Sequence, residues 1–319
     1  MTFTSAQTVG KYEFLGIIDK PKAGVTYKVR NLATGEFEVL RALPGSSHAD
    51  HDAQERFLRE IRVHTRLSHP NVVAFHDAQV LDGQLVMTSE FVEGQTLAER
   101  CRATPLPLPE AIHAISQVLS GLEEAHALGI VHRGITAEHV TITPAGEVKL
   151  GGFGLAKPAA DVNLTQTGAI LGDPAYISPE QITGATPLDA RSDLYSVGVL
   201  LYLAITGKAP FRSATDFDVM AAHVGSVPPP PSSLNPAISL ELDRIVLTAL
   251  AKRPEQRFRG AAEFRAALET VANQLAAQAP VPSRRVTQPQ GLPRSKRALG
   301  LGLAAIAIAL IVIVFVAAH

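Results

Sequence analysis

The chain has 319 residues, a formal net charge of −1 and 46% hydrophobic residues. This length suits one large domain or two small ones, and the apolar fraction is enough to build a core. The near-neutral charge gives no electrostatic footprint for nucleic-acid binding, and the single cysteine, Cys101, excludes an intrachain disulfide.

The first part of the chain alternates short apolar runs with turn residues, which is typical of strands. Four segments there predict strands: 12–18, 25–30, 36–43 and 84–91. Between the third and the fourth, residues 51–67 have a helical period that places Phe57, Ile61 and Leu67 on one face.

After Pro109 the pattern becomes mostly helical. Apolar-faced helices are predicted over residues 111–128, 194–206 and 240–250. A small strand-rich part followed by a larger helical part is an α+β arrangement. Residues 277–297, rich in proline and basic side chains, predict a flexible linker without an apolar period.

Residues 298–318 form an uncharged apolar run, ALGLGLAAIAIALIVIVFVAA. As a helix at about 1.5 Å per residue this run would be about 31 Å long, enough to cross a bilayer core of about 30 Å. A buried core helix is the alternative. Five basic residues precede the run, so the positive-inside rule predicts a single-pass helix in the cytoplasmic membrane with everything before residue 298 in the cytoplasm. The five are Arg284, Arg285, Arg294, Lys296 and Arg297.

Five motifs occur in the order and at the spacing of bacterial eukaryotic-like Ser/Thr protein kinases. They are residues 131–133 (VHR), 148–154 (VKLGGFG), 172–180 (GDPAYISPE), 191–198 (RSDLYSVG) and 251–258 (AKRPEQRF). As a set they are far more specific than any one of them. The chain therefore resembles this family over about residues 9–276, which implies a two-lobed kinase fold with an N-lobe at about 9–91 and a C-lobe at about 92–276.

The resemblance assigns fold-supporting roles to residues that match the family. Glu180 and Arg257 are expected to form a buried ion pair in the large lobe. Asp193 is expected to bind the backbone of the loop near His132 and Arg133. The complete fold-supporting set is His132, Arg133, Phe153, Gly154, Glu180, Asp193 and Arg257.

At four positions where the family carries out phosphoryl transfer, the chain has other residues. Phosphoryl transfer needs metal ions, phosphate positioning and a group that orients the attacking hydroxyl. By resemblance, Gly134 replaces the aspartate base and Thr136 the phosphate-contacting lysine. His139 and Gly152 replace the metal-binding asparagine and aspartate, so no metal site is expected.

The nucleotide site is altered as well. Gly24 is the one glycine left of three in the phosphate loop, and Pro21 there removes an N–H donor. Arg41 stands at the position of the ATP lysine, whereas Glu60 matches its helical glutamate partner. The adenine pocket differs from the family at Thr26, Val39, Ser89 and Thr141.

These replacements predict a catalytically impaired kinase-like module, a pseudokinase, that needs no cofactor. We expect it to act at the membrane as a scaffold or allosteric partner of active Ser/Thr kinases or of their substrates. The alternative is an active Ser/Thr protein kinase that uses ATP and Mg²⁺ with non-standard catalytic groups, for which Glu138 and His139 are candidates. A ligand sensor is a third possibility. Thr165 and Thr167 match activation-loop phosphosites of the family, although they also read as ordinary exposed threonines.

Overall fold

The computed structural model describes residues 3, 6–19, 24–43, 51–158, 173–184 and 188–278. The chain divides into two compact units, Met1–Gln278 and Ala279–His319. The second unit, with the predicted linker from residue 279 and the apolar run at 298–318, lies outside the described residues, as do Thr165, Thr167 and residues 20–23.

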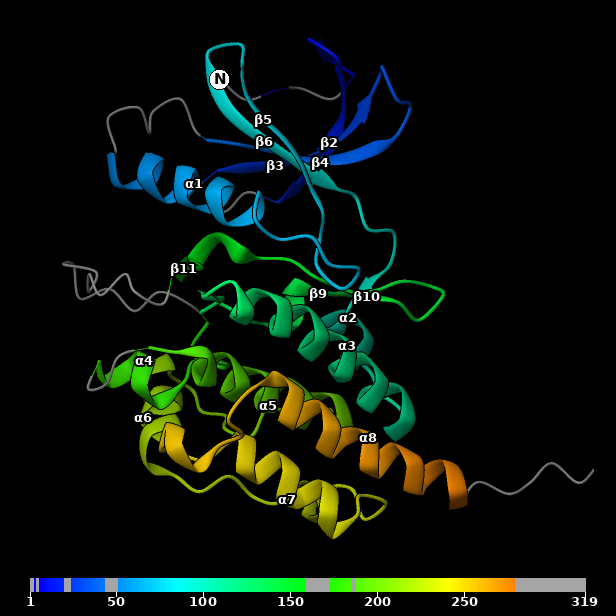
Figure 1. The fold of residues 1–319 in the computed structure, drawn as a ribbon, viewed down its shortest axis with the longest axis vertical. Coiled ribbons are helices and arrows are strands. Elements are labelled where there is room, and N and C mark those ends of the chain that lie inside the picture. The colour runs from blue at the N-terminus through cyan, green and yellow to red at the C-terminus, as the bar shows by residue number, and fades with distance from the viewer. Residues whose placement is uncertain are drawn as a thin grey trace, which may run out of the picture. The chain divides into compact units, whose positions relative to one another are not determined.

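A six-stranded antiparallel sheet forms the small lobe, in the order β1-β2-β3-β4-β6-β5 (Figure 1). The strands are β1 (Thr8–Val9), β2 (Tyr12–Asp19), β3 (Val25–Asn31), β4 (Phe37–Ala42), β5 (Phe75–Leu81) and β6 (Gln84–Glu90). Helix α1 (His51–His64) lies beside the sheet. One apolar cluster, which includes Tyr12, Tyr27 and Leu40, forms the core within the sheet, and Phe57 of α1 packs with Met87 of β6 in another.

Strand β5 was not predicted from the sequence, because its residues Phe75–Leu81 include His76, Asp77 and Gln79 and lack a clear alternation. A signal for it was present in the turn that follows. Asp82 and Gly83 both have positive φ, 49° and 75°, as a two-residue hairpin turn requires. An Asp-Gly pair before a predicted strand indicates a preceding hairpin partner.

Helices and short strands form the large lobe. The helices are α2 (Leu97–Cys101), α3 (Leu108–Ala127), α4 (Pro179–Thr183), α5 (Ala190–Thr206), α6 (Asp216–Gly225), α7 (Leu240–Ala249) and α8 (Ala261–Gln278). Strands β7 (Gln95–Thr96), β9 (Val140–Ile142) and β10 (Val148–Leu150) make one small sheet, and β8 (Ile130–Val131) with β11 (Lys157–Pro158) makes another. Short 3₁₀ turns occur at Ala137–His139, Phe153–Leu155, Pro231–Ser233 and Pro254–Gln256.

Helix α5 is the centre of this lobe, since nearly every residue from Ser192 to Thr206 is buried. Asp189 caps its first turn by accepting from Arg191 N–H at 2.8 Å, and Gly207, with φ +71°, ends it. The helix passes close to α7, because a Cβ on Gly198 would lie 2.7 Å from the Cβ of Ala249.

The two-lobed α+β architecture predicted from the sequence is confirmed, with small shifts of the element ends. Helix α1 ends at His64 rather than at residue 67. The backbone N–H groups of Arg66 and Leu67 bind carbonyls three residues back, in tight turns, and the side chain of Leu67 is buried in the core of the large lobe. Helix α3 begins at Leu108, before the predicted start, since Pro109 is tolerated in a first helical turn. Among the helices in the part of the chain that the structure describes, none combines the length and apolar character needed to cross a bilayer.

Candidate functional site

An ion pair joins the sheet to helix α1. Nη1 of Arg41, on β4, donates to both carboxylate oxygens of Glu60 on α1, at 2.6 Å each. Burial raises the pKa of the Glu60 carboxyl, although the charge of Arg41 acts in the opposite direction. The guanidinium of Arg41 also lies 5.7 Å from the ring centroid of Phe57. The structure therefore brings together Arg41 and Glu60, two of the three residues predicted for the nucleotide site.

Gly24, the third, begins the run into β3 with φ +155°. A Cβ there would lie 2.9 Å from the carbonyl oxygen of Ala42, so this close backbone approach requires glycine. Along the sheet, Thr26 pairs with Arg41 and Val39 pairs with Ser89. Three of the altered adenine-pocket residues therefore lie on the neighbouring strands β3, β4 and β6: Thr26, Val39 and Ser89.

Asp193, buried on α5, holds the loop that follows β8. Its carboxylate accepts the backbone N–H groups of His132 and Arg133 at 2.9 and 2.8 Å, and a third bond from Nε2 of His126 at 2.8 Å. Burial alone would raise the pKa of Asp193, but the hydrogen bond and charge of His126, with the other partners, lower it overall. These bonds hold Arg133 at φ +65°, a conformation rare for a residue with a side chain.

A cluster of three buried rings, in tilted and edge-to-face contact, connects α1 with this loop. The ring of Phe153 lies 4.3 Å from that of His132 and 5.6 Å from that of His64, between centroids. His132 donates from Nε2 to the carbonyl oxygen of Gly151 at 2.9 Å. Burial lowers the pKa of both histidines to about 4, so both rings are neutral at pH 7.

The positions of the family's catalytic groups lie together in the next segment. Nδ1 of His139 donates to the carbonyl oxygen of Gly134 at 2.7 Å, and Thr136 is buried at the start of the 3₁₀ turn. Gly152 has φ +80°, and the ring of His139 lies directly over it. In this loop the predicted set of Gly134, Thr136, His139 and Gly152 is brought to one place, without a carboxylate among them.

Two carboxylates near this loop remain exposed. Glu138 makes no hydrogen bond within the described residues, and Asp173 accepts from the backbone N–H of Ala175 at 2.9 Å. Both carboxylates nevertheless act on the ring of His139 electrostatically. No group of three or more histidines, cysteines or carboxylates suited to a metal ion occurs in the described part of the chain.

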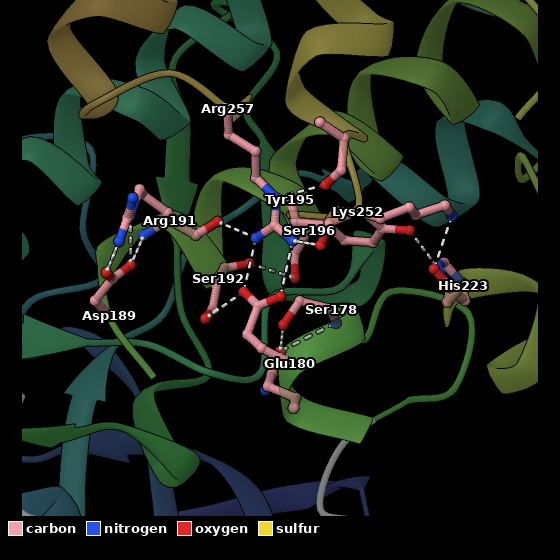
Figure 2. A network of polar contacts seen from close by, with 12 residues as sticks. Ser178, Glu180, Asp189, Arg191, Ser192, Tyr195, Ser196, His223, Lys252 and Arg257 are labelled. Atoms are coloured by element: carbon pink, nitrogen blue, oxygen red, sulfur yellow. Dashed lines mark hydrogen bonds and ion pairs between the residues drawn. The ribbon is translucent and has the colours of Figure 1, made fainter. Parts of the chain in front are cut away.

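Figure 2 shows the polar network that anchors the large lobe. Arg257 and Glu180 form a two-bonded ion pair, at 2.6 and 2.7 Å, and both side chains are almost completely buried. Ser192 donates to the same carboxylate at 2.7 Å. Burial opposes ionisation of Glu180, but the bonds from Arg257 and Ser192 lower its pKa overall. The ion pair expected from the sequence is thus formed.

Three polar residues of these networks were missed by the sequence analysis: His126, His223 and Lys252. His223 accepts from the Tyr195 hydroxyl at 2.8 Å and donates to the carbonyl oxygen of Ala175 at 3.1 Å. Lys252 donates to the carbonyl oxygen of His223 at 2.7 Å. Lys252 lies in the motif at 251–258, but the partners of all three residues come from distant parts of the chain, so their contacts could not be predicted from local patterns.

Comparisons with known proteins agree with this geometry. The protein kinase domain family model matches residues 12–269. The Ser/Thr-protein kinase pkn3 of Myxococcus xanthus is 35% identical over 88% of the chain and 56% of its own length. The Ser/Thr-protein kinase PknJ of Mycobacterium tuberculosis is 35% identical over 76% of the chain and 42% of its own length. The chain thus spans about half the length of these relatives.

Among solved structures, the kinase domain of Mycobacterium tuberculosis PknI has a TM-score of 0.64 and 27% identity. The alignment covers 85% of this chain and 99% of that domain.

The prediction of a catalytically impaired scaffold is wrong, because relatives at 35% identity are named Ser/Thr protein kinases, which favours the active-kinase alternative. The substitute groups that the sequence offers, Glu138 and His139, had been given less weight than the losses at the family's own catalytic positions. With the model match, the relatives and the two-lobed fold in agreement, the chain belongs to the protein kinase family, in its bacterial eukaryotic-like Ser/Thr branch.

Proposed function

We propose that this chain is an active Ser/Thr protein kinase, which transfers the γ-phosphate of ATP to serine or threonine hydroxyls of proteins through non-standard groups. The observation that carries the proposal is the Arg41–Glu60 pair, which holds a cation at the ATP-lysine position with bonds of 2.6 Å. The loop held by Asp193 and the ring cluster from His64 to His132 support it, since a working site needs these parts assembled.

Kinases of this family normally use Mg²⁺, but the residues present do not fit the metal ions. Mg²⁺ requires oxygen ligands in near-octahedral geometry. Here the two metal positions hold an imidazole, His139, and a residue without a side chain, Gly152, over which that imidazole lies. We therefore assign no step of the reaction to Mg²⁺.

Arg41 is the group proposed to bind the phosphates of ATP. Its Nη1 is used by Glu60 and its Nε is buried, whereas Nη2 is not buried and donates to no acceptor within the described residues. A guanidinium offers five N–H donors in a planar fork that matches phosphate oxygens. Arg41 can thus remain paired with Glu60 through Nη1 while Nη2 stabilises the charge that develops on the transferred phosphate.

His139 is the proposed proton acceptor. A carbonyl oxygen only accepts hydrogen bonds, so the bond to Gly134 places the ring proton on Nδ1 and leaves the lone pair on Nε2. Burial lowers the pKa of His139 more than the bond to Gly134 raises it, which keeps the ring neutral at pH 7. Nε2 would take the hydroxyl proton while the new O–P bond forms and the bond from phosphorus to ADP breaks.

Transfer of labelled phosphate from ATP to a generic basic protein tests the proposal. Arg41→Ala and His139→Ala are each expected to reduce the rate by about 10²–10⁴-fold. Glu263→Ala, in an exposed pair with Arg259, is the control expected to keep the wild-type rate. Wild-type protein that is folded by circular dichroism but no faster than Arg41→Ala would refute the proposed activity.

We further propose that residues 298–318 anchor the chain in the cytoplasmic membrane, with the kinase domain in the cytoplasm, and that its partners are proteins rather than nucleic acids. The uncharged apolar run and the basic residues before it support this arrangement. Such an anchor would confine phosphorylation to proteins at or near the membrane.

A further inference from the structure

The loop at the family's metal positions holds two residues in very close contact. The backbone N–H of Gly151 donates to the carbonyl oxygen of His139 at 2.8 Å, which ties the 3₁₀ turn at Ala137–His139 to the segment after β10. A Cβ built on Gly152 would lie 2.4 Å from Cγ of His139, 2.5 Å from Cδ2 and 2.6 Å from Nδ1. Real Cβ atoms do not approach other atoms below 3.0 Å, so no side chain at position 152 fits beside this ring.

The ring cannot move aside cheaply. Cγ is bound directly to Cβ, so it shifts only if the χ1 rotamer of His139 changes. That change would break the bond from Nδ1 to the carbonyl oxygen of Gly134, which is 2.7 Å long. The ring is also half-buried, with the neighbouring ring of His132 at 6.1 Å between centroids. Loss of this bond inside the loop would leave the carbonyl of Gly134, a buried residue, without that partner.

We infer that His139 and Gly152 are an interlocked pair in which the ring of His139 occupies the space of a carboxylate side chain at position 152, and thereby determines that the loop does not select Mg²⁺. His139 accounts for both missing metal ligands. It places an imidazole nitrogen at position 139 instead of an amide oxygen, and its ring leaves no space for a carboxylate at position 152. Neither Gly152→Asp nor His139→Asn alone is then expected to create a Mg²⁺ site, whereas the two substitutions together are. The inference goes beyond the proposed function and holds whether or not the chain transfers phosphate.

A cycle of four proteins tests the steric part of the inference: wild type, Gly152→Asp, His139→Asn and the double variant. Gly152→Asp is expected to lower the Tm by about 4–8 °C more in the wild-type background than in the His139→Asn background, because only the wild type has the ring in place. The strain of a left-handed aspartate occurs in both backgrounds and cancels. Equal losses of Tm in the two backgrounds would overturn the interlock.

A glycine elsewhere serves as the matched control. Gly35 has φ +79°, close to the +80° of Gly152, and a Cβ there would meet nothing within 4 Å. Gly35→Asp therefore measures the cost of the left-handed backbone alone, and it is expected to be smaller than that of Gly152→Asp. If a variant of the cycle does not fold, Gly152→Ala and His139→Ala, singly and together, give the same comparison with smaller side chains.

The metal part is tested by the thermal shift that ATP produces with and without Mg²⁺. Wild type and both single variants are expected to give the same shift in either condition. The double variant His139→Asn, Gly152→Asp is expected to gain an additional shift that requires Mg²⁺, since it has an oxygen donor at each position. A magnesium-dependent shift in wild type, or none in the folded double variant, would overturn the assignment of metal selection to this pair. No phosphate transfer is measured, so the result is separate from the test of the proposed function.

Discussion

Glu180→Ala probes the buried network of the large lobe. Arg257 uses all five of its N–H groups: Nη1 and Nη2 bind Glu180, Nη1 also binds the carbonyl of Arg191, Nη2 that of Lys252, and Nε that of Ala251, at 2.6–3.0 Å. The side chain of Arg257 is 0% exposed. Removing Glu180 therefore leaves two buried donors and a full positive charge without a partner, and Ser192 loses its acceptor.

Breaking a buried pair from one side costs about 3–5 kcal/mol of unfolding free energy. In a domain of this size that loss corresponds to a decrease in Tm of about 6–20 °C. Thermal and urea unfolding followed by circular dichroism measure both quantities.

Two variants make the result specific. Glu180→Gln keeps the shape of the side chain and one acceptor oxygen but loses the charge and the second acceptor, so it is expected to lose stability, though less than Glu180→Ala. Glu263→Ala removes an exposed pair, in which Arg259 is 90% exposed, and is expected to change the Tm very little. If Glu180→Ala melted together with Glu263→Ala, the buried ion pair would not stabilise the fold and the reasoning would fail.

The remaining predictions concern pH and the membrane. Burial lowers the pKa of His64, His132 and His223 to about 4, so the unfolded chain binds more protons below pH 6.5, and stability is lost as the pH falls from about 6.5 towards 4. Each histidine is expected to cost about 2 kcal/mol between pH 7 and 5, measured by urea unfolding at the two values, and identical unfolding midpoints would contradict this. A chain that ends at Leu292 is expected in the soluble fraction and the full chain in the membrane pellet. Cleavage of the kinase domain by a protease outside intact cells would contradict the proposed orientation.

Contacts could be predicted from the sequence where both residues of a pair lie in family motifs. Glu180 and Arg257 are 77 residues apart, yet each lies in a family motif, so their contact could be expected. The same holds for Asp193 with the loop at His132 and Arg133. Strand β5 was missed because its polar residues conceal the alternation, although the Asp82-Gly83 turn after it predicts a hairpin.

The contacts within the candidate site could be predicted less well from the sequence. His139 and Gly152 were judged as two separate losses, because nothing in the sequence indicates that the ring of one fills the space above the other. Gly152 was expected only to lack the metal-binding carboxylate, whereas its φ of +80° also favours glycine at this position. His64 was not singled out either, since a histidine on an amphipathic helix reads as polar until the packing places it against Phe153.

The way Arg41 holds Glu60 has a consequence for how the small lobe responds to its ligand. A lysine has one ammonium group, which must serve both the carboxylate and any arriving anion. Arg41 binds both oxygens of Glu60 through Nη1 alone. A ligand shifts a conformational equilibrium only by its differential affinity for the two states. An anion held by Nη2 would neither break nor make the link between β4 and α1, so the position of α1 against the sheet would be set in advance and would not depend on whether a ligand is bound.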